Sequence, residues 1–221
     1  MYPDNFYIDV YIDANGSTHD VFSPTTMAVN IARYSHFPHD RKLRRSLQSQ
    51  SVRDLLTAAL QRLFSTYKPQ TWILDKTKLG KPFLLGKDSP HISISHSGNW
   101  CACAVASSVR MGIDIEVVKN RDWASYCTEV FHSSEAQWIL AVEGKERDIR
   151  GLTCWCRKEA MVKALGLGLT IALSEIGFCA DGHLIALPQA LGNVSDWKFY
   201  TQAIQSEVVL AVAWQVNAGL A

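Results

Sequence analysis

Two acidic residues separated by one apolar residue form the clearest chemical pattern in the sequence. Asp114 and Glu116 lie in the run Gly-Ile-Asp-Ile-Glu-Val at residues 112–117, where apolar and acidic residues alternate. Alternate side chains of a strand point to the same side, so the two carboxylates would lie next to each other. A hard divalent cation, which prefers oxygen ligands, would turn their repulsion into attraction. The pattern is consistent with a metal site, but a half-buried strand with a solvated acidic face gives the same pattern.

A second polar group occurs later in the chain at helical spacing. Trp155, Glu159 and Lys163 are four residues apart and would share one face of a helix, with Lys158 beside them. A surface ion pair between Glu159 and Lys163 is an alternative explanation, but a tryptophan on the same face fits it poorly. We therefore expect Glu159 to complete the metal site and the lysines to contact phosphate oxygens. Because soft ligands are missing, Mg²⁺ is favoured over Zn²⁺.

Two other features could bind an anion. Ser95 and His96 follow a short alternating run, where a hydroxyl, an imidazole and backbone N–H groups could hold a phosphate. A single histidine at a turn is usually only a hydrogen-bonded polar residue. The second feature is a basic cluster, which consists of Arg41, Lys42, Arg44, Arg45 and Arg53. Taken alone, such a cluster is usually only solvated.

These residues must be positioned by strands and helices that alternate along the chain. Apolar spacing predicts helices over residues 52–64 and 152–165, the second ending at Gly166. Ser134 and Gln137 resemble a capping box that opens a further helix through residues 138–142. Strands are predicted at residues 6–12, 92–95, 101–106, 112–117 and 208–216. This interleaving favours an α/β or α+β fold.

Composition limits the possible functions. The chain has 221 residues, 48% of them hydrophobic, and a formal net charge of +1, so a broad nucleic-acid-binding surface is not expected. The first residues lack the features of a secretory signal, and no apolar run is long enough to span a membrane, which indicates a cytoplasmic protein. The six cysteines include no C-x-x-C pair and are expected to be reduced and buried.

The order of the motifs resembles that of 4'-phosphopantetheinyl transferases of the monomeric, surfactin-synthetase-activating type. A Gly-Ile-Asp-x-Glu run can arise by chance, but its combination with Trp-x-x-Lys-Glu-Ala-x-x-Lys is a strong joint signal. Ser93 departs from the family, where asparagine more often precedes the Ile-Ser-His-Ser run. The matching stretches are Gly80-Lys81-Pro82, residues 94–97, 112–116 and 155–160, Lys163 and residues 166–169.

The resemblance implies two α/β halves related by a pseudo-twofold axis, with coenzyme A in the cleft between them. Residues 1–110 would contact coenzyme A and residues 111–221 would carry the metal site. The Mg²⁺-dependent reaction would transfer the 4'-phosphopantetheine arm to a serine of an acyl or peptidyl carrier protein and release adenosine 3',5'-bisphosphate. The carrier could serve fatty acid, polyketide or nonribosomal peptide synthesis. Two halves in one chain would make the protein a monomer.

The resemblance also implies roles for individual residues. Asp114, Glu116 and Glu159 would hold Mg²⁺ against the pyrophosphate of coenzyme A. Charge that develops on the phosphate would be offset by Lys163, and by Lys158 as a further candidate. The contacts with coenzyme A would come from Ser95 and His96 at the 3'-phosphate, helped by Arg53 and Arg45, and from Lys81 near the nucleotide.

Three groups could take the proton from the carrier serine, namely Glu159, Glu135 or a metal-bound water. We favour Glu159. Glu135 has a simpler explanation as an acidic residue in the first turn of a helix, where the helix dipole favours it.

Two other functions would use the same residues. The first is a non-catalytic module that binds coenzyme A or a carrier protein, against which the intact acidic trio argues. The second is a small Mg²⁺-dependent nucleotide hydrolase, which would need no carrier.

Overall fold

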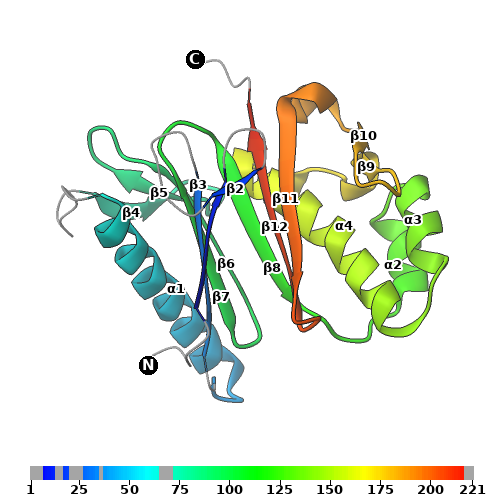
Figure 1. Cartoon of the computed structure of the whole chain (residues 1–221), viewed down its shortest axis with the longest axis horizontal. Helices are drawn as coiled ribbons and strands as arrows, with labels where there is room; N and C mark the ends of the chain where they lie inside the picture. The colour runs from blue at the N-terminus through cyan, green and yellow to red at the C-terminus, as the bar shows by residue number, and fades with distance from the viewer. Residues whose placement is uncertain (1–6, 13–16, 20–26, 35–36, 65–71, 217–221) are drawn as a thin grey trace.

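In the part of the chain that the structure describes, the fold combines several small antiparallel sheets with four α-helices. The computed structural model describes residues 7–12, 17–19, 27–34, 37–64 and 72–216. The larger sheet has the strand order β2-β1-β3-β7-β6, and a three-stranded sheet has the order β11-β12-β8. The α+β prediction is confirmed for these residues (Figure 1). The large sheet consists of β1 (Tyr7–Ile12), β2 (Thr18–His19), β3 (Met27–Arg33), β6 (His91–Ser97) and β7 (Trp100–Ala106), and the smaller one of β8 (Met111–Val117), β11 (Trp197–Ile204) and β12 (Val208–Gln215).

The remaining elements cover these sheets or connect them. Two hairpins are formed by β4 (Ile73–Lys76) with β5 (Pro82–Leu85) and by β9 (Gly177–Phe178) with β10 (Leu184–Ala186). The helices are α1 (Arg41–Leu63), α2 (Trp123–Glu129), α3 (Ser133–Leu140) and α4 (Gly144–Leu165), and short 3-10 turns occupy Gly168–Thr170, Leu173–Glu175, Gln189–Leu191 and Val194–Asp196.

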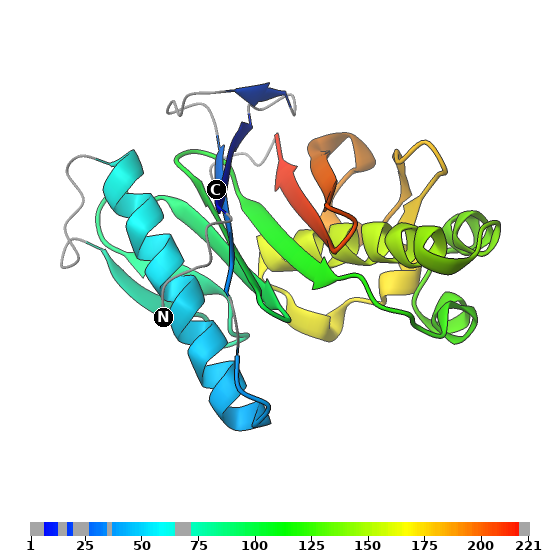
Figure 2. The same ribbon diagram turned by 60° about the horizontal axis from the view of Figure 1, so that its bottom comes forward.

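The layers follow from the apolar faces of these elements. Helix α1 packs against the five-stranded sheet, and α4 packs against the three-stranded sheet (Figures 1 and 2). A third apolar cluster lies between the two sheets and includes Ile31, Ile113 and Trp214, all without solvent exposure. Both sheets are therefore covered by apolar side chains on both faces, and the edge strands β6 and β8 lie side by side.

Helix α1 begins earlier than the predicted residue 52. Asp40 caps it, because its Oδ1 accepts the backbone N–H of Leu43 at 2.7 Å. The first turns are largely charged and exposed, so the apolar spacing becomes visible only where the helix reaches the sheet at Val52. The basic cluster thus belongs to the helix itself. Gln48 of α1 connects the helix to the β6–β7 turn, because its side-chain amide donates a hydrogen bond to the Gly98 carbonyl at 2.7 Å.

The helices of the second half also differ from prediction at their starts. Helix α3 is capped by His132 with Glu135, and not by Ser134 with Gln137. Helix α4 begins at Gly144, before the predicted residue 152, and α2 is a helix that the sequence did not indicate. The predicted end of α4 is confirmed, since Gly166 adopts the left-handed conformation with a φ of 72°.

The predicted strands are confirmed where the structure describes them. Phe6 lies outside the described residues, and Val216 lies just after the end of β12. The two large sheets fall on either side of the predicted boundary between residues 110 and 111, while the pseudo-twofold relation of the halves stays a prediction. All six cysteines are unpaired, and five are buried. Within the described ranges, the helices are too short or too polar to cross a membrane.

Candidate active site

The close packing of α4 on β8 brings the two predicted motifs together. Gly112 makes this possible, because a Cβ atom there would lie 2.1 Å from the Ala160 carbonyl oxygen and 2.5 Å from the Ala164 nitrogen. Neither backbone atom can move aside without displacing the helix. The glycine of the Gly-Ile-Asp run therefore sets the distance between the strand carboxylates and the polar face of α4.

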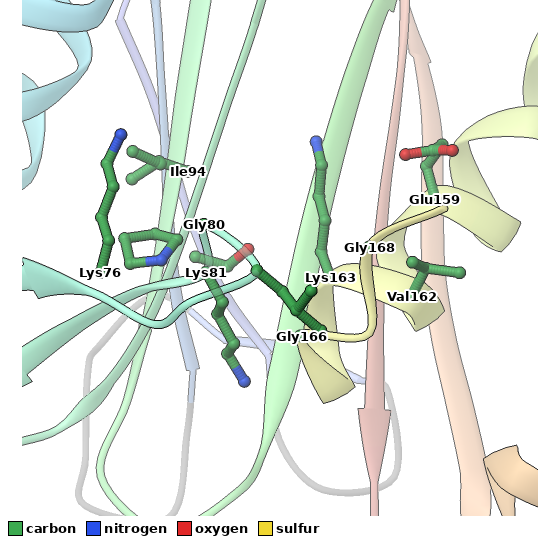
Figure 3. A pocket seen from close by; sticks show the side chains of 12 residues that line it. Lys76, Gly80, Lys81, Ile94, Glu159, Val162, Lys163, Gly166 and Gly168 are labelled. Atoms are coloured by element: carbon green, nitrogen blue, oxygen red, sulfur yellow. The ribbon is translucent and has the colours of Figure 1, made fainter. Parts of the chain in front are cut away.

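A cavity of about 440 Å³ lies where α1, β6, β8 and α4 meet. Asp114 and Glu116 line it from β8, as do Trp155, Glu159 and Lys163 from α4. The predicted shared face of Trp155, Glu159 and Lys163 is thus confirmed. A neighbouring cavity of about 280 Å³ is bordered by the β4–β5 hairpin and the end of α4 (Figure 3), and Glu159 and Lys163 line both.

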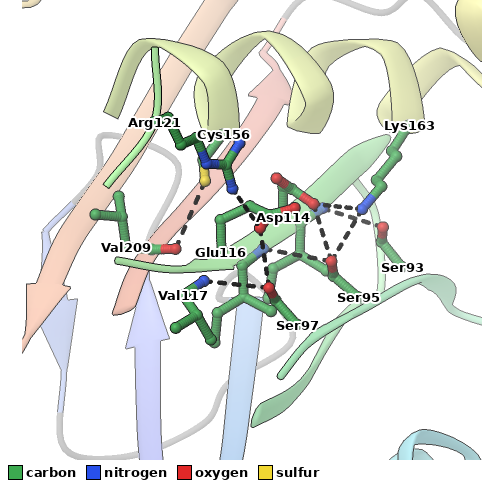
Figure 4. A network of polar contacts seen from close by, with 12 residues as sticks. Ser93, Ser95, Ser97, Asp114, Glu116, Val117, Arg121, Cys156, Lys163 and Val209 are labelled. Atoms are coloured by element: carbon green, nitrogen blue, oxygen red, sulfur yellow. Dashed lines mark hydrogen bonds and ion pairs between the residues drawn. The ribbon is translucent and has the colours of Figure 1, made fainter. Parts of the chain in front are cut away.

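Asp114 is the most buried of the three predicted ligands, with 4% of its surface exposed. Its Oδ1 accepts hydrogen bonds from the Ser95 hydroxyl at 2.9 Å and from the Lys163 ammonium at 2.6 Å (Figure 4). Burial opposes the charge of Lys163, but the Asp114 carboxylate raises the pKa of Lys163 overall. A solvated acidic face does not describe this strand.

Glu116 is held in a parallel way. Its Oε2 accepts from the Ser97 hydroxyl at 2.9 Å and from the Arg121 guanidinium at 3.0 Å (Figure 4). Arg121 lies in the loop after β8, and its side chain is 13% exposed. Arg121 was not predicted from the sequence, because a single arginine in a loop carries no periodic signal.

Glu159 supplies the third carboxylate. Burial and the nearby Asp114 charge raise its pKa, which places the two acidic side chains in one electrostatic environment. Oε1 of Glu159 and Oδ2 of Asp114 are buried and have no hydrogen-bond partner among the described residues. Both residues line the cavity of about 440 Å³, and two buried carboxylate oxygens without a partner suit a hard cation.

The three carboxylates do not form a ready ligand cluster. Among the residues that the structure describes, no group of three His, Cys, Asp or Glu side chains is arranged to hold a metal ion. Lys163 and Arg121 each occupy one oxygen of a strand carboxylate, so a shared metal would bind the other oxygens. The metal site predicted at Asp114, Glu116 and Glu159 therefore stays a prediction.

Lys158 does not lie at this site, which corrects the expectation that it contacts phosphate. Its side chain is fully buried, and its ammonium forms an ion pair with Oε2 of Glu135 at 2.6 Å. It also donates to the carbonyls of Val130 at 3.1 Å and Leu173 at 2.9 Å. Burial lowers the pKa of Lys158, whereas the Glu135 charge acts in the opposite direction.

Glu135 is equally remote from the cavity. It is 1% exposed, and it accepts the backbone N–H of His132 at 2.8 Å as part of the α3 cap. Of the two roles considered for Glu135, the structure therefore supports that of an acidic residue in the first turn of a helix. A buried, paired carboxylate of this kind cannot reach a substrate hydroxyl.

Of the residues predicted to hold the 3'-phosphate, Ser95 and His96 line the cavity, whereas Arg45 and Arg53 are not among its lining residues. Arg45, Ser49 and Arg53 are four residues apart on α1, and Ser49 lines the cavity. His96 lines it from β6, and its pKa is lowered by desolvation, by Lys163 and by Arg45. The Ser95 hydroxyl is already bonded to Asp114 and Lys163, so a phosphate would have to compete for it.

Lys81 lines the smaller cavity, but its ammonium donates to the Ala164 carbonyl at the end of α4. Burial, followed by the charge of Arg110, lowers the pKa of Lys81 to about 8. Figure 3 shows Lys76 and Lys163 extending to one side and Lys81 to the other. Lys76 lines both cavities and was missed by the sequence analysis, since no motif includes it.

Comparison with known proteins gives the class to which this arrangement belongs. Residues 110–213 match the 4'-phosphopantetheinyl transferase superfamily. The resemblance predicted from the motifs is thus confirmed at the level of the superfamily. The surfactin-synthetase-activating subtype stays a prediction.

Individual relatives match parts of the chain. A Synechocystis sp. protein provisionally named a 4'-phosphopantetheinyl transferase is 26% identical over 169 residues, covering 71% of this chain and 64% of the relative. The 4'-phosphopantetheinyl transferases of Bacillus pumilus and Bacillus subtilis strain 168 are 35% and 34% identical over 43% and 50% of this chain. The matches cover 40% of the Bacillus pumilus protein and 50% of the Bacillus subtilis protein, so this chain spans less than two thirds of each of these relatives.

Proposed function

We propose that this protein transfers the 4'-phosphopantetheine arm of coenzyme A to a serine of an acyl or peptidyl carrier protein, with Mg²⁺ as cofactor. The serine oxygen forms a bond to the phosphorus next to the pantetheine, and the pyrophosphate bond breaks to release adenosine 3',5'-bisphosphate. The observation that carries the proposal is the meeting of Asp114, Glu116, Glu159 and Lys163 at one cavity, and these residues lie in the region that matches the transferase superfamily.

The side chains at the cavity have distinct roles in this proposal. Asp114, Glu116 and Glu159 would hold the magnesium ion, which when bound offsets the charge of the donor pyrophosphate. Lys163 lies beside Asp114 and would meet the phosphate oxygens on which charge grows. His96 lines the cavity and would face the 3'-phosphate. It would be helped by Arg45 and Arg53 of α1, which lie on either side of the lining residue Ser49 along the helix.

The serine proton requires a base at the cavity. The burial and pairing of Glu135 exclude it, which leaves Glu159 as the candidate base among the protein's own side chains. Glu159 lines both cavities, so a hydroxyl and a phosphate bound in them would both be near its carboxylate.

Intact-mass analysis of apo carrier proteins tests the reaction directly. Incubation with this protein, coenzyme A and Mg²⁺ should add the mass of one phosphopantetheine arm to at least one acyl or peptidyl carrier. A carrier in which the acceptor serine is replaced by alanine serves as the control. Binding of coenzyme A without any mass gain would instead favour a non-catalytic module, and breakdown of coenzyme A without a carrier would favour a hydrolase.

The affinity for coenzyme A should depend on the protonation of His96. Desolvation and the charges of Lys163 and Arg45 hold the pKa of His96 below its ordinary value, so the free protein carries a largely neutral imidazole at neutral pH. A bound phosphate would raise this pKa, and binding would therefore take up a proton and tighten as pH falls.

Calorimetric titration with coenzyme A between about pH 5 and pH 8 checks this expectation. His96→Asn should lose the tightening at low pH, and the difference between the two proteins isolates His96 because the ligand phosphates titrate equally in both. An identical pH profile for the two proteins would show that His96 does not face the phosphate.

A further inference from the structure

A row of serine hydroxyls joins the edge strands β6 and β8. Ser93, Ser95 and Ser97 alternate along β6, so their side chains point to the same side. Their oxygens accept the backbone N–H groups of every second residue of β8, at Ile113 (3.0 Å), Ile115 (3.3 Å) and Val117 (3.1 Å). Side-chain hydroxyls thus satisfy the β8 N–H groups that face the neighbouring sheet.

The hydroxyls of Ser95 and Ser97 have a second bond that follows from this register. Each donates to the carboxylate of the residue that precedes its N–H partner, which is Asp114 for Ser95 and Glu116 for Ser97, both at 2.9 Å. For Ser93 the corresponding residue is Gly112, which has no side chain. The three serines therefore make the same backbone contact, but only two of them hold a carboxylate.

A basic side chain donates a further hydrogen bond to the same oxygen of each carboxylate. Lys163 shares Oδ1 of Asp114 with Ser95, and Arg121 shares Oε2 of Glu116 with Ser97 (Figure 4). The other oxygen of Asp114 is buried without a hydrogen-bond partner among the described residues. Fixing one oxygen of a carboxylate fixes the direction in which the other one points.

We propose that Ser97 and Arg121 are positioning residues, which hold Oε2 of Glu116 so that its other oxygen is directed to a cation shared with Asp114 and Glu159. This inference rests on the proposed function, since that function supplies the metal. Hydrogen bonds to charged acceptors are stronger than neutral ones, and partners of metal ligands orient those ligands. Ser97 and Arg121 would therefore act on the metal through Glu116 without touching the substrate.

Binding of Mn²⁺ to the full chain, followed by electron paramagnetic resonance, tests the inference without any catalytic readout. Ser97→Ala should weaken Mn²⁺ binding by about 10-fold, the lower end of the effect that partners of metal ligands have. Ser93→Ala is the matched control, because it removes the same kind of backbone contact without releasing a carboxylate. It should lower the melting temperature about as much as Ser97→Ala and leave the Mn²⁺ affinity unchanged.

Two further variants keep the test decisive if Ser97→Ala folds poorly. Ser97→Thr retains the hydroxyl and should retain the affinity for Mn²⁺. Arg121→Gln removes the second contact with Glu116 and should weaken Mn²⁺ binding in the same direction as Ser97→Ala.

The outcomes separate this inference from the proposed reaction. Equal Mn²⁺ affinities for Ser97→Ala, Arg121→Gln and Ser93→Ala would overturn the positioning role. Suppose that Ser97→Ala and Arg121→Gln weaken Mn²⁺ binding and Ser93→Ala does not, while the protein modifies no carrier. This result would support the positioning role and reject the transfer reaction. If the protein without any substitution binds no Mn²⁺, both the positioning role and the proposed transfer reaction are overturned.

Discussion

Replacing Glu159 by glutamine should reduce the rate of phosphopantetheine transfer by about 100- to 1000-fold, the loss typical when one preorganised electrostatic group is removed from a reaction centre. The substitution keeps the shape of the side chain and removes one of three charges that would hold the cation. The fold should not suffer, because Oε1 of Glu159 is buried without a hydrogen-bond partner among the described residues and the side chain lies close to Asp114, whose charge repels it.

Transfer to an apo carrier at limiting Mg²⁺, followed by mass spectrometry, measures the effect. Glu146→Gln is a suitable control, since it is the same substitution in the same helix, at a side chain that is 57% exposed and paired with Arg150. Its rate should equal that of the unchanged protein. Near-normal transfer by Glu159→Gln, with an unchanged melting temperature, would remove Glu159 from the reaction centre.

Replacing Lys158 by methionine should destabilise the protein by about 3–5 kcal/mol, the usual cost of removing one partner of a buried ion pair. The change leaves the Glu135 carboxylate without its cation, at a position where burial already raises the pKa of Glu135. It also leaves the Val130 and Leu173 carbonyls without their shared donor.

Denaturant unfolding of the variant measures this loss. Lys145→Met, at an exposed position in the first turn of α4, is the control and should change the free energy of unfolding by less than about 0.5 kcal/mol. The double variant Lys158→Met with Glu135→Gln should recover part of the stability, because it no longer buries an uncompensated charge. A Lys158→Met protein of normal stability that fails in transfer would restore the phosphate contact that the sequence suggested.

Lys158 shows why the site could be only partly predicted. It lies three residues after Trp155 and next to Glu159, so its spacing is compatible with the active face as well as with the buried one. The choice depends on Glu135 and Leu173, which approach from other parts of the chain and surround its ammonium. Arg121 and Lys76 were missed for a related reason, since each reaches the site from a segment without a periodic pattern.

The sequence by itself determined the local faces of this protein. A period of two placed Asp114 and Glu116 on one side of a strand, and a spacing of four placed Trp155, Glu159 and Lys163 on one side of a helix, because backbone geometry alone sets these directions. The tertiary structure decided which faces meet. Close packing at Gly112 brings the helix onto the strand, and the serine hydroxyls of β6 set the register in which each strand carboxylate receives its partners. Such contacts depend on packing between distant segments, which no local pattern records.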